Sequence, residues 1–256
     1  MKRGFLIRLL PVAIGCMFSG CVHIDVTRVK VDADLALPAP PIVPDSAQPG
    51  KIYGQGALRV SSADPVGGDA VCWNNSPVGV DAALQYVVTR HVRILAGGSM
   101  SSTPSAWIGL GTNVRNSILA WDFDVLAGTT RSKVAIQGLV SGRHEEEDRE
   151  RNTPVSDEGD RLLSWMQFAA RVRARGSGPW MEFRLQPGMA VGVLKDPEGD
   201  ADDRGTSASA TAMGIGWVQE FRGESALIVG ARKVNTWLDE ESSVVAQGLV
   251  SWVQPF

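Results

Sequence analysis

Residues 179–193 read PWMEFRLQPGMAVGV, and this stretch decides the fold because apolar side chains recur at every second position. An extended strand would place apolar groups on one face and polar groups or glycine on the other: Met181, Phe183, Leu185, Met189 and Val191 against Glu182, Arg184, Gln186 and Gly188. A period of two predicts a β-strand with one apolar face.

The segments on both sides follow the same rule. Residues 117–128, 162–175 and the final strand to Phe256 all alternate, and read as helices they would have no apolar stripe. Strand structure is therefore favoured throughout this part of the chain. We predict strands near residues 80–89, 92–100, 107–113, 117–128 and 133–142, five more toward the carboxyl end, and a further candidate at 53–61.

The strand lengths and the connections predict a barrel that crosses a membrane. The strands span about ten to fourteen residues, against five or six in globular proteins, and a tilted membrane strand needs about ten. Counted back from the carboxyl end, long acidic connections alternate with short ones, as in outer-membrane barrels. The sequence predicts an all-β fold, an antiparallel up-and-down β-barrel of about ten strands (eight to twelve) that spans a membrane. A soluble β-barrel or β-sandwich is the alternative.

The first residues have the features of an export signal. Lys2 and Arg3 precede an uncharged run over residues 9–20, which is too short to cross a bilayer as a helix. The run ends at Ser19-Gly20-Cys21, which resembles the lipobox of bacterial lipoproteins. The resemblance implies cleavage before Cys21 and acylation of its thiol with palmitate-like chains. An ordinary signal peptide that is cut nearby is the alternative.

A proline-rich segment separates this leader from the alternating strands. Residues 37–44 read LPAPPIVP, and prolines this dense favour an extended polyproline II conformation and are excluded from the interior of a sheet. We therefore predict three parts: residues 1–20 as signal peptide, 21–50 as lipid anchor and proline-rich tether, and 51–256 as the β-barrel domain. Within the tether, residues 22–33 alternate briefly and predict one strand.

The carboxyl end carries a second signal. Apolar residues such as Trp252 precede Phe256 at alternating positions, which resembles the terminal assembly signal of outer-membrane barrels, although Gln254 departs from that pattern. Both ends together resemble a bacterial outer-membrane β-barrel protein with a lipoprotein-type signal, without a specific functional family. The resemblance implies a lipid-anchored location in the cell outer membrane, with outer-membrane lipid and the barrel-assembly and lipoprotein-sorting machineries as partners. We expect aromatic girdles of Trp180, Trp217, Trp252 and Phe256 at the periplasmic rim and of Trp165 and Trp237 at the outer rim.

Composition argues against several other classes of function. The formal net charge is −3, and residues 1–20 contribute only cations, so the exported chain is more acidic still. A nucleic-acid-binding surface would need a basic patch instead. Cys72 is the only cysteine after Cys21, so no disulfide is predicted within the exported chain.

Residues that carry chemistry are sparse. Asp196, Glu198, Asp200 and Asp202 alternate like the ligands of a calcium loop, but the glycine and glutamate that such a loop requires are missing, which favours a solvated loop. His144 beside three glutamates is the main suggestion of a catalytic base, as in barrels that are lipid-modifying hydrolases. The sequence has no Walker loop, zinc spacing or GxSxG motif. We predict no enzyme, no metal and no cofactor.

The polar faces of the strands predict a lumen instead of an active site. Arg171, Arg173, Glu182 and Arg184 would point inward and pair across neighbouring strands. We expect a structural or surface-interaction role. The alternatives are a small-solute channel in the same barrel, or a soluble, lipid-tethered β module that binds a ligand in the periplasm.

Overall fold

The computed structural model describes residues 23–32, 37–62, 71–74, 77–101, 103–143, 150–194, 204–238 and 241–256, and these ranges contain strands and their connections. None of the described residues belongs to a helix with the length and apolar character that a membrane span requires. The strands are β1 (His23–Asp32), β2 (Ile52–Ser61), β3 (Val71–Asn74), β4 (Val78–Val87), β5 (Val92–Met100), β6 (Ser105–Arg115), β7 (Leu119–Arg143), β8 (Glu150–Ala174), β9 (Gly178–Leu194), β10 (Arg204–Phe221), β11 (Ser225–Leu238) and β12 (Glu241–Pro255).

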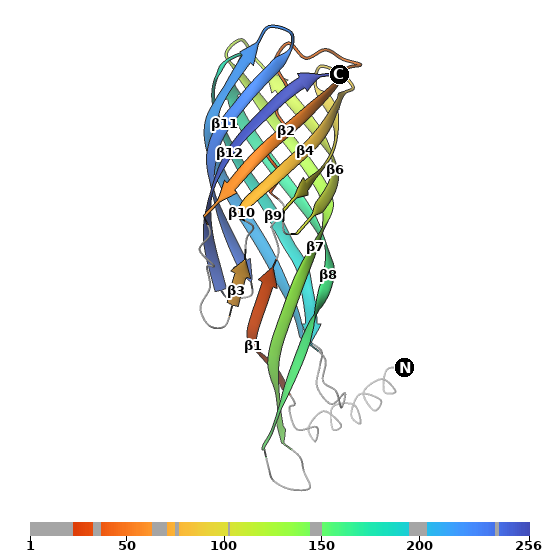
Figure 1. Ribbon diagram of the computed structural model, residues 1–256, viewed down its shortest axis with the longest axis vertical. Coiled ribbons are helices and arrows are strands. Elements are labelled where there is room, and N and C mark those ends of the chain that lie inside the picture. The colour runs from red at the N-terminus through yellow and green to blue at the C-terminus, as the bar shows by residue number, and fades with distance from the viewer. Residues whose placement is uncertain are drawn as a thin grey trace, which may run out of the picture.

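Ten of these strands form a closed antiparallel barrel (Figure 1). Neighbours in sequence pair around the ring from β4 to β12, and β2 closes it by pairing with both β4 and β12. The predicted up-and-down barrel of about ten strands is confirmed, and a closed ring excludes the β-sandwich.

One part of the strand prediction is wrong. The segments 117–128 and 133–142 are not separate strands but parts of β7, which pairs with β8 without interruption from Leu119 to Arg143. Residues 129–132, which we expected to turn, keep the alternation of exposed and buried side chains. The place thus left in the ring is taken by the 53–61 candidate, observed as β2. With β2 in the ring, the short turn at residues 88–91 lies at the same end of the barrel as the other short turns.

β7 and β8 continue beyond the ring as a long two-stranded ribbon, at the lower end of the barrel in Figure 1. There β1 pairs antiparallel with Lys133–Ser141 of β7, and β3 pairs parallel with β1. The position of β1 matches the strand predicted over residues 22–33. We call β1, β3 and these parts of β7 and β8 the extension.

The wall of the barrel is apolar outside and polar inside. Along β9, Met181, Phe183 and Leu185 are exposed, whereas Glu182 and Arg184 are buried. The other strands of the ring repeat this division, with exposed apolar side chains that include Ile52, Leu58, Leu84, Ile94, Ile108, Phe123, Phe168, Met213, Ile215 and Val250. A water-soluble domain buries its apolar face, so this barrel is reversed relative to a soluble one.

Candidate functional site: the lumen and the segment that fills it

The lumen contains a network of buried charges. Arg171, Arg173, Glu182 and Arg184, the residues predicted to face it, all lie inside the ring with fully buried side chains. Sequence analysis missed further members of the network, which are Arg59, Asp81, Arg93, Asp122, Asp124 and Arg232. Each stands at a polar position in an otherwise apolar alternating strand, and this signal would have identified them.

Glu182 is the central acid of the network. Its carboxylate oxygens lie 3.1 Å from Arg184 Nε, 3.4 Å from Arg171 Nη2 and 3.6 Å from Arg232 Nη1. Three arginines thus share one buried carboxylate. Because a buried cation is costly unless it is paired, the remaining guanidinium donors require other acceptors nearby.

Those acceptors come from the chain's own amino-terminal part. We call residues 37–50 the lumenal segment. Residues 37–44 are buried inside the barrel, with Leu37, Ile42 and Val43 almost completely so, whereas Ser46 and residues 48–50 are exposed. The prediction of a tether that spaces an anchor from the barrel is therefore wrong for these residues. Polyproline II geometry was expected to keep the segment out of a sheet, and it does, but the segment runs through the interior of the barrel instead of outside it.

The carbonyl groups of the first half of the lumenal segment accept hydrogen bonds from the wall. Pro38 O accepts from Arg184 Nη1 at 2.7 Å and from Arg232 Nη1 at 3.1 Å, and Leu37 O accepts from Arg232 Nη2. Pro40 O accepts from Gln55 Nε2 at 2.8 Å. Charged donors make the stronger of these bonds, so Arg184 and Arg232, two of the three arginines around Glu182, also hold the peptide.

The prolines of the segment suit this environment because they have no N–H group. The arginine and glutamine side chains of the lumen supply hydrogen-bond donors. A proline accepts such bonds through its carbonyl group and needs no acceptor from the wall, because it has no N–H. Of the remaining amides, Ala39 N donates to Asp81 Oδ2 at 2.7 Å and Ile42 N donates to Pro40 O at 2.9 Å. The segment and the wall are therefore complementary in hydrogen bonding.

The second half of the segment packs in an apolar cluster. Ile42 and Val43 meet the buried side chains of Tyr53, Val87, Trp180, Val218, Ala226, Ile228, Leu249 and Val253. Trp180 has room because Gly216 and Gly230 face it, and a Cβ atom at either residue would lie within 2.8 Å of the indole ring. This cluster closes the lumen toward the end where β2 begins.

Asp45 fastens the segment to the wall at that end. Its carboxylate accepts from Arg173 Nη2 at 2.7 Å, from the backbone N–H of Gly176 at 2.8 Å and from Arg175 Nε at 3.3 Å. Burial raises the pKa of Asp45, but Arg173, the Gly176 amide and Arg115 outweigh it and hold the pKa below its ordinary value. The Asp45 carboxylate is therefore ionised at neutral pH where it contacts Arg173 and Gly176.

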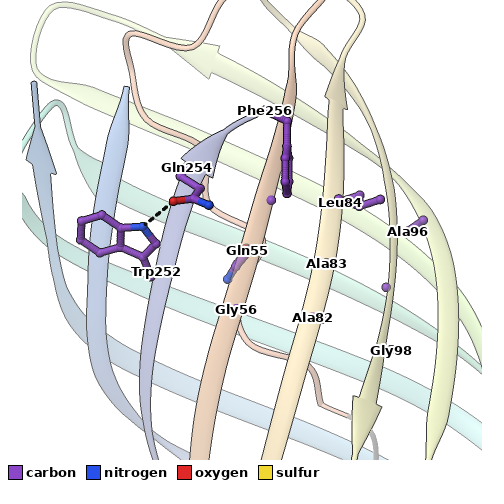
Figure 2. Close-up of a pocket in the computed structure, with 12 residues that line it drawn as sticks. Gln55, Gly56, Ala82, Ala83, Leu84, Ala96, Gly98, Trp252, Gln254 and Phe256 are labelled. Atoms are coloured by element: carbon purple, nitrogen blue, oxygen red, sulfur yellow. Dashed lines mark hydrogen bonds between the residues drawn. The ribbon is translucent and has the colours of Figure 1, made fainter. Parts of the chain in front are cut away.

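The outer face has its own specific feature at the seam between β12 and β2. Figure 2 shows Phe256 lying against β2, and its ring occupies the place where a Cβ atom of Gly54 would be. Trp252 Nε1 donates to Gln254 Oε1 at 3.3 Å beside a shallow depression that is floored by small residues such as Gly56 and Ala82. Trp252 and Phe256 are exposed, and their role as an assembly signal stays a prediction.

The predicted aromatic girdles are partly wrong. Trp180 and Trp165 lie inside the barrel, because each stands on the same face of its strand as buried polar residues. Trp165 Nε1 donates to Thr130 Oγ1 at 3.0 Å in the interior. Trp217, Trp237 and Trp252 do face outward. The alternation therefore outranks the identity of an aromatic residue in deciding which way it points.

Several predicted residues lie outside the described part of the chain. They are Cys21, His144 and the acidic residues Asp196, Glu198, Asp200 and Asp202. Among the described residues, no group of three or more histidine, cysteine or acidic side chains is arranged to hold a metal ion.

Comparison with known proteins gives the following. No protein-family model matches the chain, and no curated protein matches it. Among solved structures it is similar to the outer membrane protease OmpT from Escherichia coli, with 10% identity, a TM-score of 0.35, and coverage of 91% of this chain and 94% of that one. It is also similar to the β domain of the Bordetella autotransporter BrkA, with 9% identity, a TM-score of 0.32, and coverage of 80% and 98%. At these values neither comparison assigns an activity to this chain.

Proposed function

We propose that the protein is a bacterial outer-membrane β-barrel whose lumen is closed by its own amino-terminal segment, with a structural or surface-interaction role. The observation that carries this proposal is the reversed wall together with its filled interior. Apolar side chains face outward on every strand of the ring, whereas charged ones face inward, where Arg173, Arg184 and Arg232 donate to carbonyl groups of the lumenal segment.

The outer face supports the membrane part of the proposal. An apolar band with polar ends is what a bilayer requires of a barrel, and closure leaves no unpaired strand edge in lipid. Beyond the band, the outward residues of the extension become charged, with exposed Arg131, Lys133, Glu158 and Asp160. A soluble periplasmic module would instead leave its whole apolar outer face in water, which exceeds the patches that soluble monomers expose.

The filled lumen argues against the channel alternative. In the described residues the segment occupies the interior from Leu37 to the apolar cluster around Trp180, with its carbonyl groups bonded to the wall. Eight strands enclose an interior just wide enough for side chains to fill, so a ring of ten has room for a peptide but not for a wide channel beside it. Conduction would require the segment to leave and the arginines to lose their acceptors.

Conductance in planar bilayers tests this proposal. We expect the purified protein to be silent, and a variant with residues 38–43 replaced by glycine and serine to conduct ions. A matched variant carries a glycine–serine replacement of the same length in the connection 63–68, and it should be silent like the parent. Conductance of the unmodified protein at the level of the 38–43 variant would favour the channel instead.

Fractionation of Cys21→Ser tests the membrane assignment and separates it from the lipid anchor. We expect this variant to remain in the outer membrane and to migrate faster on a gel when it is not heated. Its appearance as a soluble periplasmic protein would mean that lipid alone had held it, and would support the ligand-binding module.

A further inference from the structure

The direction of the lumenal segment can be read from its contacts with the wall. Leu37 and Pro38 bond to Arg232 and Arg184, which lie within the strands. Asp45 bonds to Gly176, which lies in the short turn between β8 and β9. The segment therefore runs toward the short-turn end, where it enters β2.

The strand that precedes the segment lies at the opposite end. β1 pairs with β7 from His23↔Ser141 to Asp32↔Lys133, past the part of β7 that pairs with β6. Because β7 runs from the short-turn end toward its tip at Arg143, His23 is farther from the ring than Asp32. β1 thus runs from the tip of the extension toward the ring, and Leu37, the next described residue, is buried inside the barrel.

The two ends of the barrel differ in their connections. The turns at residues 88–91, 116–118, 175–177 and 222–224 are short and lie with Phe256 at one end. At the other end, beside β1, the connections that join β2 to β4, β7 to β8 and β9 to β10 are longer, whereas those that join β5 to β6 and β11 to β12 are short. Outer-membrane barrels keep their short turns in the periplasm and their long loops outside the cell.

We propose that the barrel passes its own amino-terminal segment through the outer membrane and displays the amino-terminal end of β1 at the cell surface. This inference rests on the proposed membrane barrel. It gives β1 the function of holding the displayed end against β7.

Three epitope insertions test this topology. One follows Val22, the second lies in the connection between β7 and β8, and the third follows Arg222 in a short turn. We expect antibody to bind the first two on intact cells, and the third only after the outer membrane is permeabilised. A first epitope that is hidden while the second is accessible would overturn the proposal, as would access to the Arg222 epitope alone.

A second measurement covers the case in which an insertion prevents folding. Thr27→Cys in a Cys72→Ser background, labelled with a membrane-impermeant maleimide, reports on β1 without an insertion. Labelling on intact, non-permeabilised cells supports display, and labelling that requires permeabilisation overturns it. Gel mobility without heating is recorded for each variant. A folded, non-conducting barrel with a hidden amino terminus would reject display while leaving the plugged barrel intact.

Discussion

The two faces of the barrel wall are built from the same strands but meet different surroundings. On β9, Met181 and Phe183 project outward, toward the lipid that we propose surrounds the barrel, while Glu182 and Arg184 project inward to particular atoms of the network and the lumenal segment. A fluid apolar medium accepts almost any apolar side chain. A buried charge accepts only a partner at the right distance and angle.

This difference teaches where the chain's specificity lies. An outward substitution among apolar residues leaves no cavity, because lipid or detergent fills the space. An inward substitution leaves either a void or an unpaired polar group. We therefore expect large costs inside the barrel and small ones outside it, and the predictions below test that contrast in order of decreasing effect.

The largest effect is expected for Glu182→Gln. The substitution removes the carboxylate that three buried arginines share, and breaking a buried pair in this way costs about 3–5 kcal/mol. The free energy of unfolding would be measured by urea titration of the barrel in micelles, followed by gel mobility without heating. Glu158→Gln, at an exposed position of the extension, is the matched control, and it should differ from the parent by less than about 0.5 kcal/mol. Equal losses in the free energy of unfolding of the two variants would contradict the prediction that the Glu182 carboxylate stabilises the barrel by pairing with three arginines.

A smaller effect is expected for Ile42→Ala in the lumenal segment. Ile42 is fully buried in the cluster around Trp180, and truncation of a buried isoleucine costs about 2 kcal/mol or more through lost burial and a residual cavity. Ile108→Ala removes the same atoms from an outward position that is 67% exposed, and should cost much less. The same urea titration compares the two. If Ile108→Ala were the more damaging variant, the outer face would be the specific one.

The outer face was also the easier face to foresee. The alternation in residues 179–193 identifies which side chains of β9 face each way, because a strand has a period of two whatever surrounds it. The same rule places Arg171 and Arg173 inside. It could not reveal residues 37–44 in the lumen, because a proline-rich segment has no period and its partners come from strands far along the chain. The inward polar residues Gln55, Arg59 and Asp81 were an available hint that the interior had something to bind.

The contribution of Asp45 predicts a dependence on pH. Because its pKa in the folded protein lies below the ordinary value of 3.8, the stabilisation is complete above about pH 4 and is lost as the pH falls through the lower, folded-state pKa. Asp45→Asn should cost about 1–2 kcal/mol at neutral pH, since it removes charge from bonds to Arg173 and Arg175. Urea titrations of both proteins from pH 7 to pH 3 measure this difference. It should shrink below pH 4, and a constant difference would show that the ionised carboxylate is not what stabilises the segment.

The smallest effect is expected at Gly54, an outward position of β2 that faces the ring of Phe256. An alanine methyl group at Gly54 would overlap the ring of Phe256, whereas a Cβ atom at Gly56, two residues along the same face of β2, meets nothing within 4 Å. Phe256 is 79% exposed and ends the chain, so its ring has room to move and the cost of Gly54→Ala should stay near 1 kcal/mol. Gly56→Ala should be neutral or slightly stabilising, because it only reduces the freedom of the unfolded chain. The difference between these two alanine variants, measured by urea titration, isolates the contact of Phe256 with β2. If both variants have the same free energy of unfolding, the contact of Phe256 with β2 contributes nothing to stability. The outer face would then lack a specific contact at this seam, in contrast to the inner face.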